Sequence, residues 1–145
     1  MPEIAFHFNA PDKLAYTCRL LRKAVGAGSR VVVTGPAALL ERLDTLLWTF
    51  SQGDFVAHAR VPGAELVVQA SPVLLAENPA QNLPHKQVLL NLGDDTPAGV
   101  EDYQRVIEVV SLDESDRQQA RGRWRYYTEQ GYAIVRHDLN LKGSA

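Results

Sequence analysis

Short apolar runs with almost no polar alternation constrain the fold of this chain more than any other feature. Residues 30–34, 88–92 and 105–110 form such runs and are rich in valine, isoleucine and leucine. Strands of this composition are typically buried on both faces, as in a parallel sheet that is covered by helices on either side. A further run at 4–8, followed by an Asn-Ala-Pro sequence, predicts another strand that leads into a helix.

Between these strands, apolar residues recur at the three- and four-residue spacing of helices. They are Leu14, Cys18, Leu21 and Val25 in the first segment, and Leu39, Leu43, Leu47 and Phe50 in the second. A long helix is predicted from about 112 to 130. Ser111 and Glu114 have the spacing of a capping box at its start, and Gly131 suits a left-handed closing position.

Prolines and glycines interrupt the middle of the chain, where 65–69 and 73–76 both have the composition of strands and 100–104 suggests a short helix. The alternation of strands and helices with short connections predicts an α/β fold. We expect a three-layer sandwich with a mainly parallel sheet, Rossmann-like in topology but without a nucleotide-binding motif. The length of 145 residues is typical of one domain, so 1–145 is predicted to be a single domain.

Composition excludes several classes of protein. The 15 Lys and Arg against 17 Asp and Glu give a formal net charge of −2, whereas proteins that bind nucleic acid through their overall field are usually basic. Cys18 is the single cysteine, which excludes an intrachain disulfide and a multi-cysteine zinc site. The sequence has neither a signal-peptide pattern nor an apolar run of membrane-spanning length, so we expect a cytoplasmic protein without membrane contact.

Motifs for catalysis and cofactor binding are missing from the sequence. The loops at 9–12 and 35–38, after the first two strands, lack the glycine pattern that holds a dinucleotide, and there is no P-loop or nucleophile elbow. The four histidines are scattered without the spacing of metal ligands, and Asp94-Asp95 is typical of a solvated turn. We therefore expect no catalytic site, no metal and no cofactor.

The last predicted helix carries the most unusual pattern, RQQARGRWR from Arg117 to Arg125, with four arginines and no acidic residue. At about 100° per residue, one side of the helix presents Arg117, Arg121, Trp124 and Arg125, while Arg123 points elsewhere. Such a surface is either a solvated basic face or a site for an anionic group beside an aromatic one. If it binds a ligand, the net charge of the chain favours a short acidic peptide over a nucleic-acid strand.

A second candidate surface lies where the helix over 39–50 ends. Trp48 is off the main apolar line of that helix, and Phe55 follows a polar break. These aromatics either cap the hydrophobic core or form an apolar docking patch.

Several of these features occur together in a known family. They are the aromatic first strand Ala5-Phe6-His7-Phe8, the sequence Leu46-Leu47-Trp48 leading to Phe55-Val56-Ala57-His58, the run at 88–92, and the tail with Val106-Ile107-Glu108-Val109-Val110-Ser111, Arg121-Gly122-Arg123-Trp124-Arg125-Tyr126-Tyr127 and Gly131-Tyr132. In their order and spacing, the chain resembles the chi subunit of bacterial DNA polymerase III over nearly its whole length.

The resemblance implies a non-enzymatic subunit of the clamp-loader assembly. Members of that family bind the acidic C-terminal tail of single-stranded-DNA-binding protein (SSB), which ends in acidic residues and a terminal Phe, and so they contact DNA only indirectly. The family's tail-binding residues match Arg117, Arg121, Trp124 and Arg125. Arginines replace lysines that can occur at 117 and 125, and Trp124 stands where a tyrosine can.

The resemblance also implies a second partner. The family's surface for the psi subunit includes aromatics that match Trp48 and Phe55. For this chain the resemblance leaves three uses of the surface open: binding of psi, binding of the helicase of an alternative chi complex, or no partner. From the residues alone, two other functions stay open. One is an α/β enzyme with a site near Asn9, Gly35 or Gly93, and the other is direct binding of single-stranded nucleic acid.

Overall fold

The predicted alternation of strands and helices is present in the structure, a computed structural model that describes residues 1–49 and 56–140. In chain order the elements are β1 (Glu3–Ala10), α1 (Lys13–Gly26), β2 (Val31–Thr34), α2 (Ala37–Thr49), β3 (His58–Val61), α3 (Glu65–Ala70), β4 (Val73–Ala76), β5 (Val88–Asn91), the 3₁₀ helix η1 (Val100–Asp102), β6 (Arg105–Ser111), α4 (Glu114–Glu129) and β7 (Ile134–Asp138).

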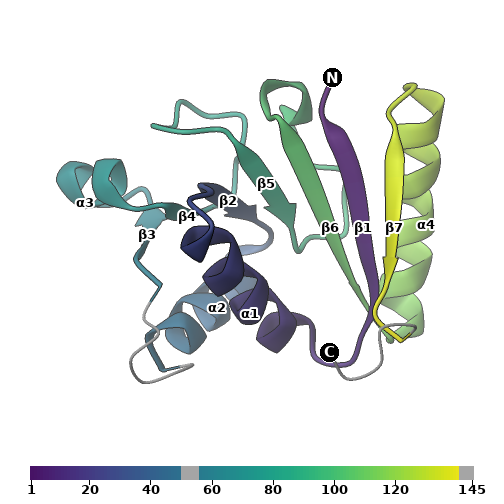
Figure 1. Cartoon of the computed structure of the whole chain (residues 1–145), viewed down its shortest axis with the longest axis horizontal. Helices are drawn as coiled ribbons and strands as arrows, with labels where there is room; N and C mark the ends of the chain where they lie inside the picture. The colour runs from purple at the N-terminus through teal and green to yellow at the C-terminus, as the bar shows by residue number, and fades with distance from the viewer. Residues whose placement is uncertain (50–55, 141–145) are drawn as a thin grey trace.

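The strands form one sheet in the order β3-β4-β2-β5-β6-β1-β7 (Figure 1). Every pair of neighbouring strands in the described residues is parallel, which confirms the predicted parallel sheet. The apolar runs form the interior strands, and the two edges are the more polar β3 and β7. The first and last strands of the chain, β1 and β7, are therefore neighbours at one edge.

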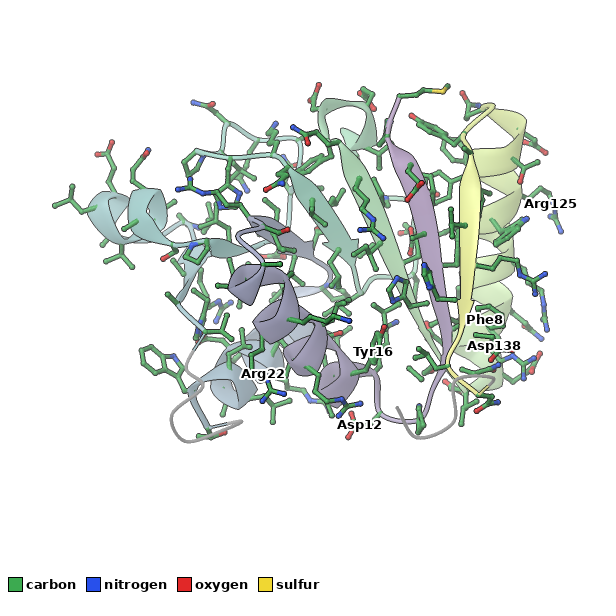
Figure 2. The ribbon with its side chains drawn as sticks, in the orientation of Figure 1. Phe8, Asp12, Tyr16, Arg22, Arg125 and Asp138 are labelled. Atoms are coloured by element: carbon green, nitrogen blue, oxygen red, sulfur yellow. The ribbon has the colours of Figure 1, made fainter. Side chains whose placement is uncertain are left out.

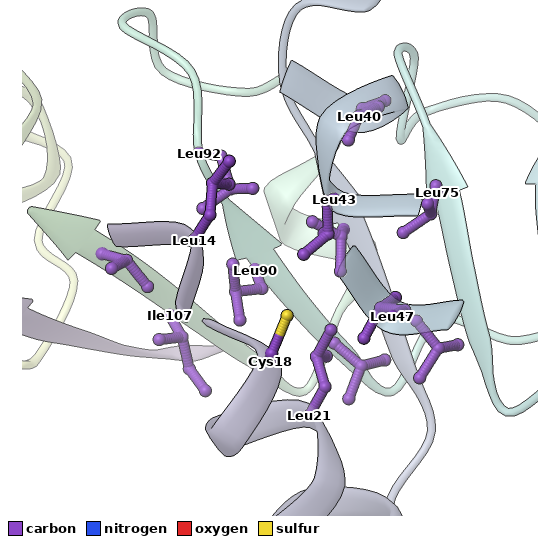
Figure 3. Packing of buried hydrophobic residues seen from close by; sticks show 14 of the residues in the cluster. Leu14, Cys18, Leu21, Leu40, Leu43, Leu47, Leu75, Leu90, Leu92 and Ile107 are labelled. Carbon is purple, nitrogen blue, oxygen red and sulfur yellow. The ribbon is translucent and has the colours of Figure 1, made fainter. Parts of the chain in front are cut away.

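Helices cover both faces of this sheet, as the continuous apolar strands predict. Along β2, Val31 and Val33 pack with residues of α1 and α2 such as Leu21 and Leu43 (Figure 3). Val32 faces the opposite core, which is covered by α3, η1 and α4. All three valines of β2 are almost completely buried. The three-layer α/β architecture is thus confirmed.

One segment predicted to have the composition of a strand, 65–69, is instead the helix α3. The physical reason lies in the topology. β3 and β4 are parallel neighbours, so the chain between them must return along the sheet and has no partner for another strand. Only Val68 of α3 is buried, whereas Leu66 and Val67 are exposed. The other strand predicted in this region, 73–76, is confirmed as β4.

The start of α4 differs in detail from the predicted capping box. The N-cap is Asp113, and the Ser111 hydroxyl accepts from the Asp113 N–H at 3.2 Å. Asp116, not Glu114, reaches back to the Ser111 N–H at 2.8 Å. The predicted capping box is wrong because the helix begins two residues later than expected, with Asp113 rather than Ser111 at the N-cap. The helix does end as expected, with Gly131 in the left-handed region at φ 85°.

β3 and β7 were not predicted from the sequence. Both are edge strands with polar residues facing solvent, so neither has a continuous apolar run. No helix in the described parts of the chain is long and apolar enough to cross a membrane.

Candidate functional site

The two sides of α4 have different environments, which follows from its 3.6-residue period. Ala120, Arg123 and Tyr127 are buried against the sheet. The predicted residues Arg117, Arg121 and Arg125 lie on the exposed side, and Trp124 is half-buried at the boundary. Figure 2 shows Arg125 extending outward from α4, away from the sheet.

A cavity of about 670 Å³ lies between α4 and the sheet edge formed by β1 and β7. The structure brings all four residues selected from helical spacing to its lining: Arg117, Arg121, Trp124 and Arg125. The sheet contributes Phe6 and Phe8 from β1 and Arg136 from β7. We call this space the arginine cavity.

Aromatic rings form the inner wall of the arginine cavity. The rings of Phe6 and Trp124 are tilted against each other with centroids 5.0 Å apart. The guanidinium carbon of Arg136 lies 5.3 Å from the centroid of the Phe8 ring and 5.8 Å from that of Trp124. These distances are typical of cation–π contacts. A ligand here meets apolar surface and positive charge side by side.

The charge of the arginine cavity favours an anion, since the described residues that line it include four arginines and one acidic residue, Glu129. Two of the arginines already have an acidic neighbour: Arg121 Nη1 is 3.3 Å and Arg117 Nη1 is 4.0 Å from the Glu114 carboxylate. Within the described residues, no carboxylate forms an ion pair with Arg125.

A buried polar network anchors α4 to the sheet beneath the cavity. The Glu108 carboxylate of β6, which is fully buried, accepts from Arg123 Nε at 2.9 Å, from the Tyr127 hydroxyl at 2.8 Å and from Asn91 Nδ2 at 3.0 Å. Arg123 Nη1 also donates to the Asp94 carbonyl oxygen at 2.8 Å. Burial and the nearby Glu108 charge raise the pKa of Tyr127, so its hydroxyl stays protonated and donates.

A second ion pair fixes the N-terminal end of α4. Lys13 Nζ of α1 lies 3.1 Å from Asp116 Oδ1. Burial alone raises the pKa of Asp116, but the N–H of Ser111 and the ammonium of Lys13 outweigh it, and the pKa is lower than usual. The helix that carries the arginines is thus held at its start and along its inner side.

Asn9 shapes the end of the cavity where β1 stops. Its φ of 66° is in the left-handed region, which asparagine tolerates better than most residues. There its side-chain Nδ2 donates to Asp138 Oδ1 of β7 at 2.9 Å, and Figure 2 shows Asp138 beside Phe8. This bond fastens the last strand to the first, and Asn9 itself lines the cavity.

Among the cavity residues that the sequence did not single out are Phe6, Phe8 and Arg136. Phe6 and Phe8 alternate along β1 and therefore share a face, which the sequence does indicate once a strand is assumed. Arg136 gave no signal, because β7 was not predicted. In the structure Arg136 pairs with Phe6 in the β1–β7 register and so lies on the same face.

The second candidate surface lies on the other side of the sheet. Trp48 on α2 is 63% exposed, so it does not cap the core. Its ring contacts that of His58 at 5.2 Å between centroids, and His58 Nε2 is 2.8 Å from Asp44 Oδ1. Phe55 lies outside the described residues.

A smaller cavity of about 340 Å³ lies at the carboxyl ends of β2 and β5, near Gly35 and Gly93. This is where an α/β enzyme would hold its substrate. Its lining, within the described residues, has acidic and amide groups but no histidine, cysteine, lysine or arginine. Among the same residues there is no cluster of three or more potential metal ligands.

Comparison with known proteins agrees with the resemblance. A model of the family "DNA polymerase III chi subunit, HolC" matches residues 1–135. The chain is 34% identical over 128 residues to DNA polymerase III subunit chi of Pseudomonas aeruginosa, covering 88% of this chain and 87% of that protein. It is 26% identical over 119 residues to the same subunit of Haemophilus influenzae, covering 81% of each chain.

Among solved structures, the C-terminal domain of the DEAD-box protein Dbp5 has a similar fold. Its TM-score is 0.59 at 14% identity, covering 97% of this chain and 91% of that one. At this identity the likeness concerns the fold alone. The family match over residues 1–135 and the 34% identity to a chi subunit concern the sequence itself, and by them this chain belongs to the family of DNA polymerase III chi subunits.

Proposed function

We propose that this chain is a cytoplasmic, non-catalytic adaptor that links the DNA polymerase III assembly to SSB by binding the acidic C-terminal tail of SSB in the arginine cavity. One observation carries the proposal. The residues selected by helical spacing, Arg117, Arg121, Trp124 and Arg125, lie around one cavity whose inner wall is aromatic. A peptide that ends in acidic residues and a terminal Phe requires both kinds of surface.

The arginines of α4 differ in whether an acidic side chain of the protein already lies beside them. Arg121 and Arg117 face Glu114, which holds their side chains near the cavity mouth without burying them. Arg125 is exposed and extends outward. Acidic residues of the tail replace water around these guanidinium groups, and charge-assisted hydrogen bonds then form. Salt should weaken binding, because exposed charges are screened.

Contact with DNA is indirect in this proposal. Four arginines on a chain of net charge −2 provide few phosphate contacts. Mixing the protein with a fluorescent single-stranded oligonucleotide at physiological salt tests this directly. Tight binding without SSB would favour a direct nucleic-acid binder instead.

The first experiment is a pull-down of SSB from the same organism by this protein. Full-length SSB should be retained, and SSB that lacks its last few residues should not. Equal retention of both forms would show that the tail is not what the protein binds.

The second experiment locates the site by calorimetry with a peptide of the SSB tail. We expect Arg121→Ala to weaken binding about tenfold, the lower end for a charge-assisted contact, because the side chain is 57% exposed. Arg42→Ala is the matched control, since Arg42 is also an exposed helical arginine but lies on α2. If both variants bind like wild type, the tail binds elsewhere.

Trp48 supports a second protein contact. An exposed tryptophan is costly to leave in water and is frequent at the centre of interfaces, and Trp48 lies on the face opposite to α4. We infer that this surface binds psi or an alternative helicase partner, together with Phe55. The Trp48→Ala variant should no longer co-purify with that partner, and its binding to the SSB tail should be unchanged. Loss of both would indicate a general folding defect.

A further inference from the structure

Of the described arginines that line the cavity, Arg136 alone comes from the sheet rather than from α4. It lies on the edge strand β7, directly beside Phe6 in the β1–β7 register. Its guanidinium group therefore projects over the aromatic inner wall, with the rings of Phe8 and Trp124 at 5.3 Å and 5.8 Å. Arg125, by contrast, extends away from the sheet.

The hydrogen-bonding capacity of Arg136 is not used by carboxylates of the described residues, none of which forms an ion pair with it. Its contacts are to ring faces, which attract the positive charge but are not strong acceptors for N–H groups. A guanidinium group has five N–H donors in a planar fork that matches the two oxygens of a carboxylate. The rings thus hold Arg136 in place and leave its donors to a ligand.

We propose that Arg136 binds the free C-terminal carboxylate of the bound peptide and thereby distinguishes a chain end from an internal apolar residue. The inference rests on the proposed function of the arginine cavity. In a terminal Phe, the carboxylate and the side chain leave the same Cα atom. When the ring packs on Phe8 and Trp124, the carboxylate is within reach of Arg136, which contacts the same two rings.

In this arrangement the arginines of α4 bind a different part of the peptide. Arg117, Arg121 and Arg125 lie along the helix at the outer side of the cavity, where they meet the side-chain carboxylates that precede the terminal residue. Removing one of them should weaken the binding of a free-acid peptide and of an amidated peptide by the same factor. Only Arg136 should lose its effect when the terminal carboxylate is replaced by an amide.

Fluorescence anisotropy tests this with a peptide of the last eight or so residues of the organism's own SSB, labelled at its N-terminus and made with either a free or an amidated C-terminus. For wild-type protein we expect amidation to weaken binding about tenfold, the effect of one charge-assisted pair. For Arg136→Gln, the free-acid peptide should bind about tenfold more weakly, and amidation should change the affinity less than twofold. Arg136→Lys keeps the charge but not the planar fork of donors, so its affinity for the free-acid peptide should lie between those of wild type and Arg136→Gln.

Arg125→Gln is the matched control, because it removes an arginine of the same cavity from α4. It should weaken both peptides while the tenfold ratio between them persists. If the ratio also persists in Arg136→Gln, or if wild type binds both peptides equally, the assignment of Arg136 is overturned while the proposed function stands. If wild type binds neither peptide, the proposed function fails and this inference fails with it. Thermal unfolding of each variant verifies that it is folded.

Discussion

Replacing Arg123 by methionine tests how α4 is held on the sheet. The side chain of Arg123 is 2% exposed, and its Nε lies 2.9 Å from the Glu108 carboxylate, which is completely buried. Arg123→Met keeps most of the side-chain volume but leaves Glu108 without a counter-charge. Removing one partner of a buried pair costs about 3–5 kcal/mol. Two donors to Glu108 remain, Tyr127 at 2.8 Å and Asn91 at 3.0 Å, which places the expected loss near the lower end.

Urea unfolding followed by circular dichroism measures this loss. With a denaturant slope of about 1–3 kcal/mol per molar urea, a loss of about 3 kcal/mol moves the midpoint down by roughly 1–3 M. The loss should also shrink as the pH falls. Burial raises the pKa of Glu108 and the Arg123 charge opposes this, so without Arg123 the pKa rises further and the folded variant gains stability from protonation in acid.

Arg125→Met is the matched control, since it makes the same chemical change two residues away on the exposed side of α4. It should alter the free energy of unfolding by no more than about 0.5 kcal/mol. Equal losses for the two variants, or a loss for Arg123→Met that grows toward acid pH, would refute the reasoning that a buried charge at Glu108 depends on Arg123.

Three further predictions follow from the packing and the ion pairs. Leu43→Ala, at a fully buried position, should lower the free energy of unfolding by about 2–5 kcal/mol in thermal or urea denaturation, and a loss below 1 kcal/mol would mean that the core closes over the gap. Asp116→Asn should be less stable than wild type at neutral pH. The pKa of Asp116 in the folded protein is below 3.8, so its contribution to the free energy of unfolding is complete above that pH and disappears as the pH falls through the folded pKa. The urea midpoints of wild type and Asp116→Asn should therefore converge in acid. A constant difference between the midpoints would contradict the assignment. Cys18, which is fully buried and whose pKa burial raises to about 11, should react with a thiol reagent at pH 8 only in denaturant, and rapid reaction of the native protein would contradict its position in the core.

The parts of the fold that could be predicted are those where one local pattern decides the structure. Continuous apolar runs predict β2, β5 and β6, and helical spacing predicts α1, α2 and the exposed face of α4. The same spacing grouped Arg117, Arg121, Trp124 and Arg125, which do share one cavity. These predictions succeed because periodicity and burial are properties of each segment alone.

The missed parts depend on contacts between distant segments. In α3 the β-branched residues favour a strand, and the need to connect two parallel neighbours overrides them. Arg136 belongs to the cavity only because β7 pairs with β1, a contact that no local pattern indicates. Glu108 did give a usable signal, since an acidic residue in the middle of a buried strand requires a buried partner. Helical geometry separated Arg123 from the other arginines but did not identify it as that partner.

The pairing of β7 with β1 has a consequence for the time at which the cavity exists. Asn9 and Asp138, which join the two strands, are 129 positions apart in the chain. Since a nascent chain leaves the ribosome N-terminus first, β1 and the α4 arginines emerge before the strand that completes the cavity. A chain released before residue 134 would still present Arg117, Arg121 and Arg125 but would lack both Arg136 and the edge of the sheet that supports it. The complete cavity therefore requires that synthesis has passed β7.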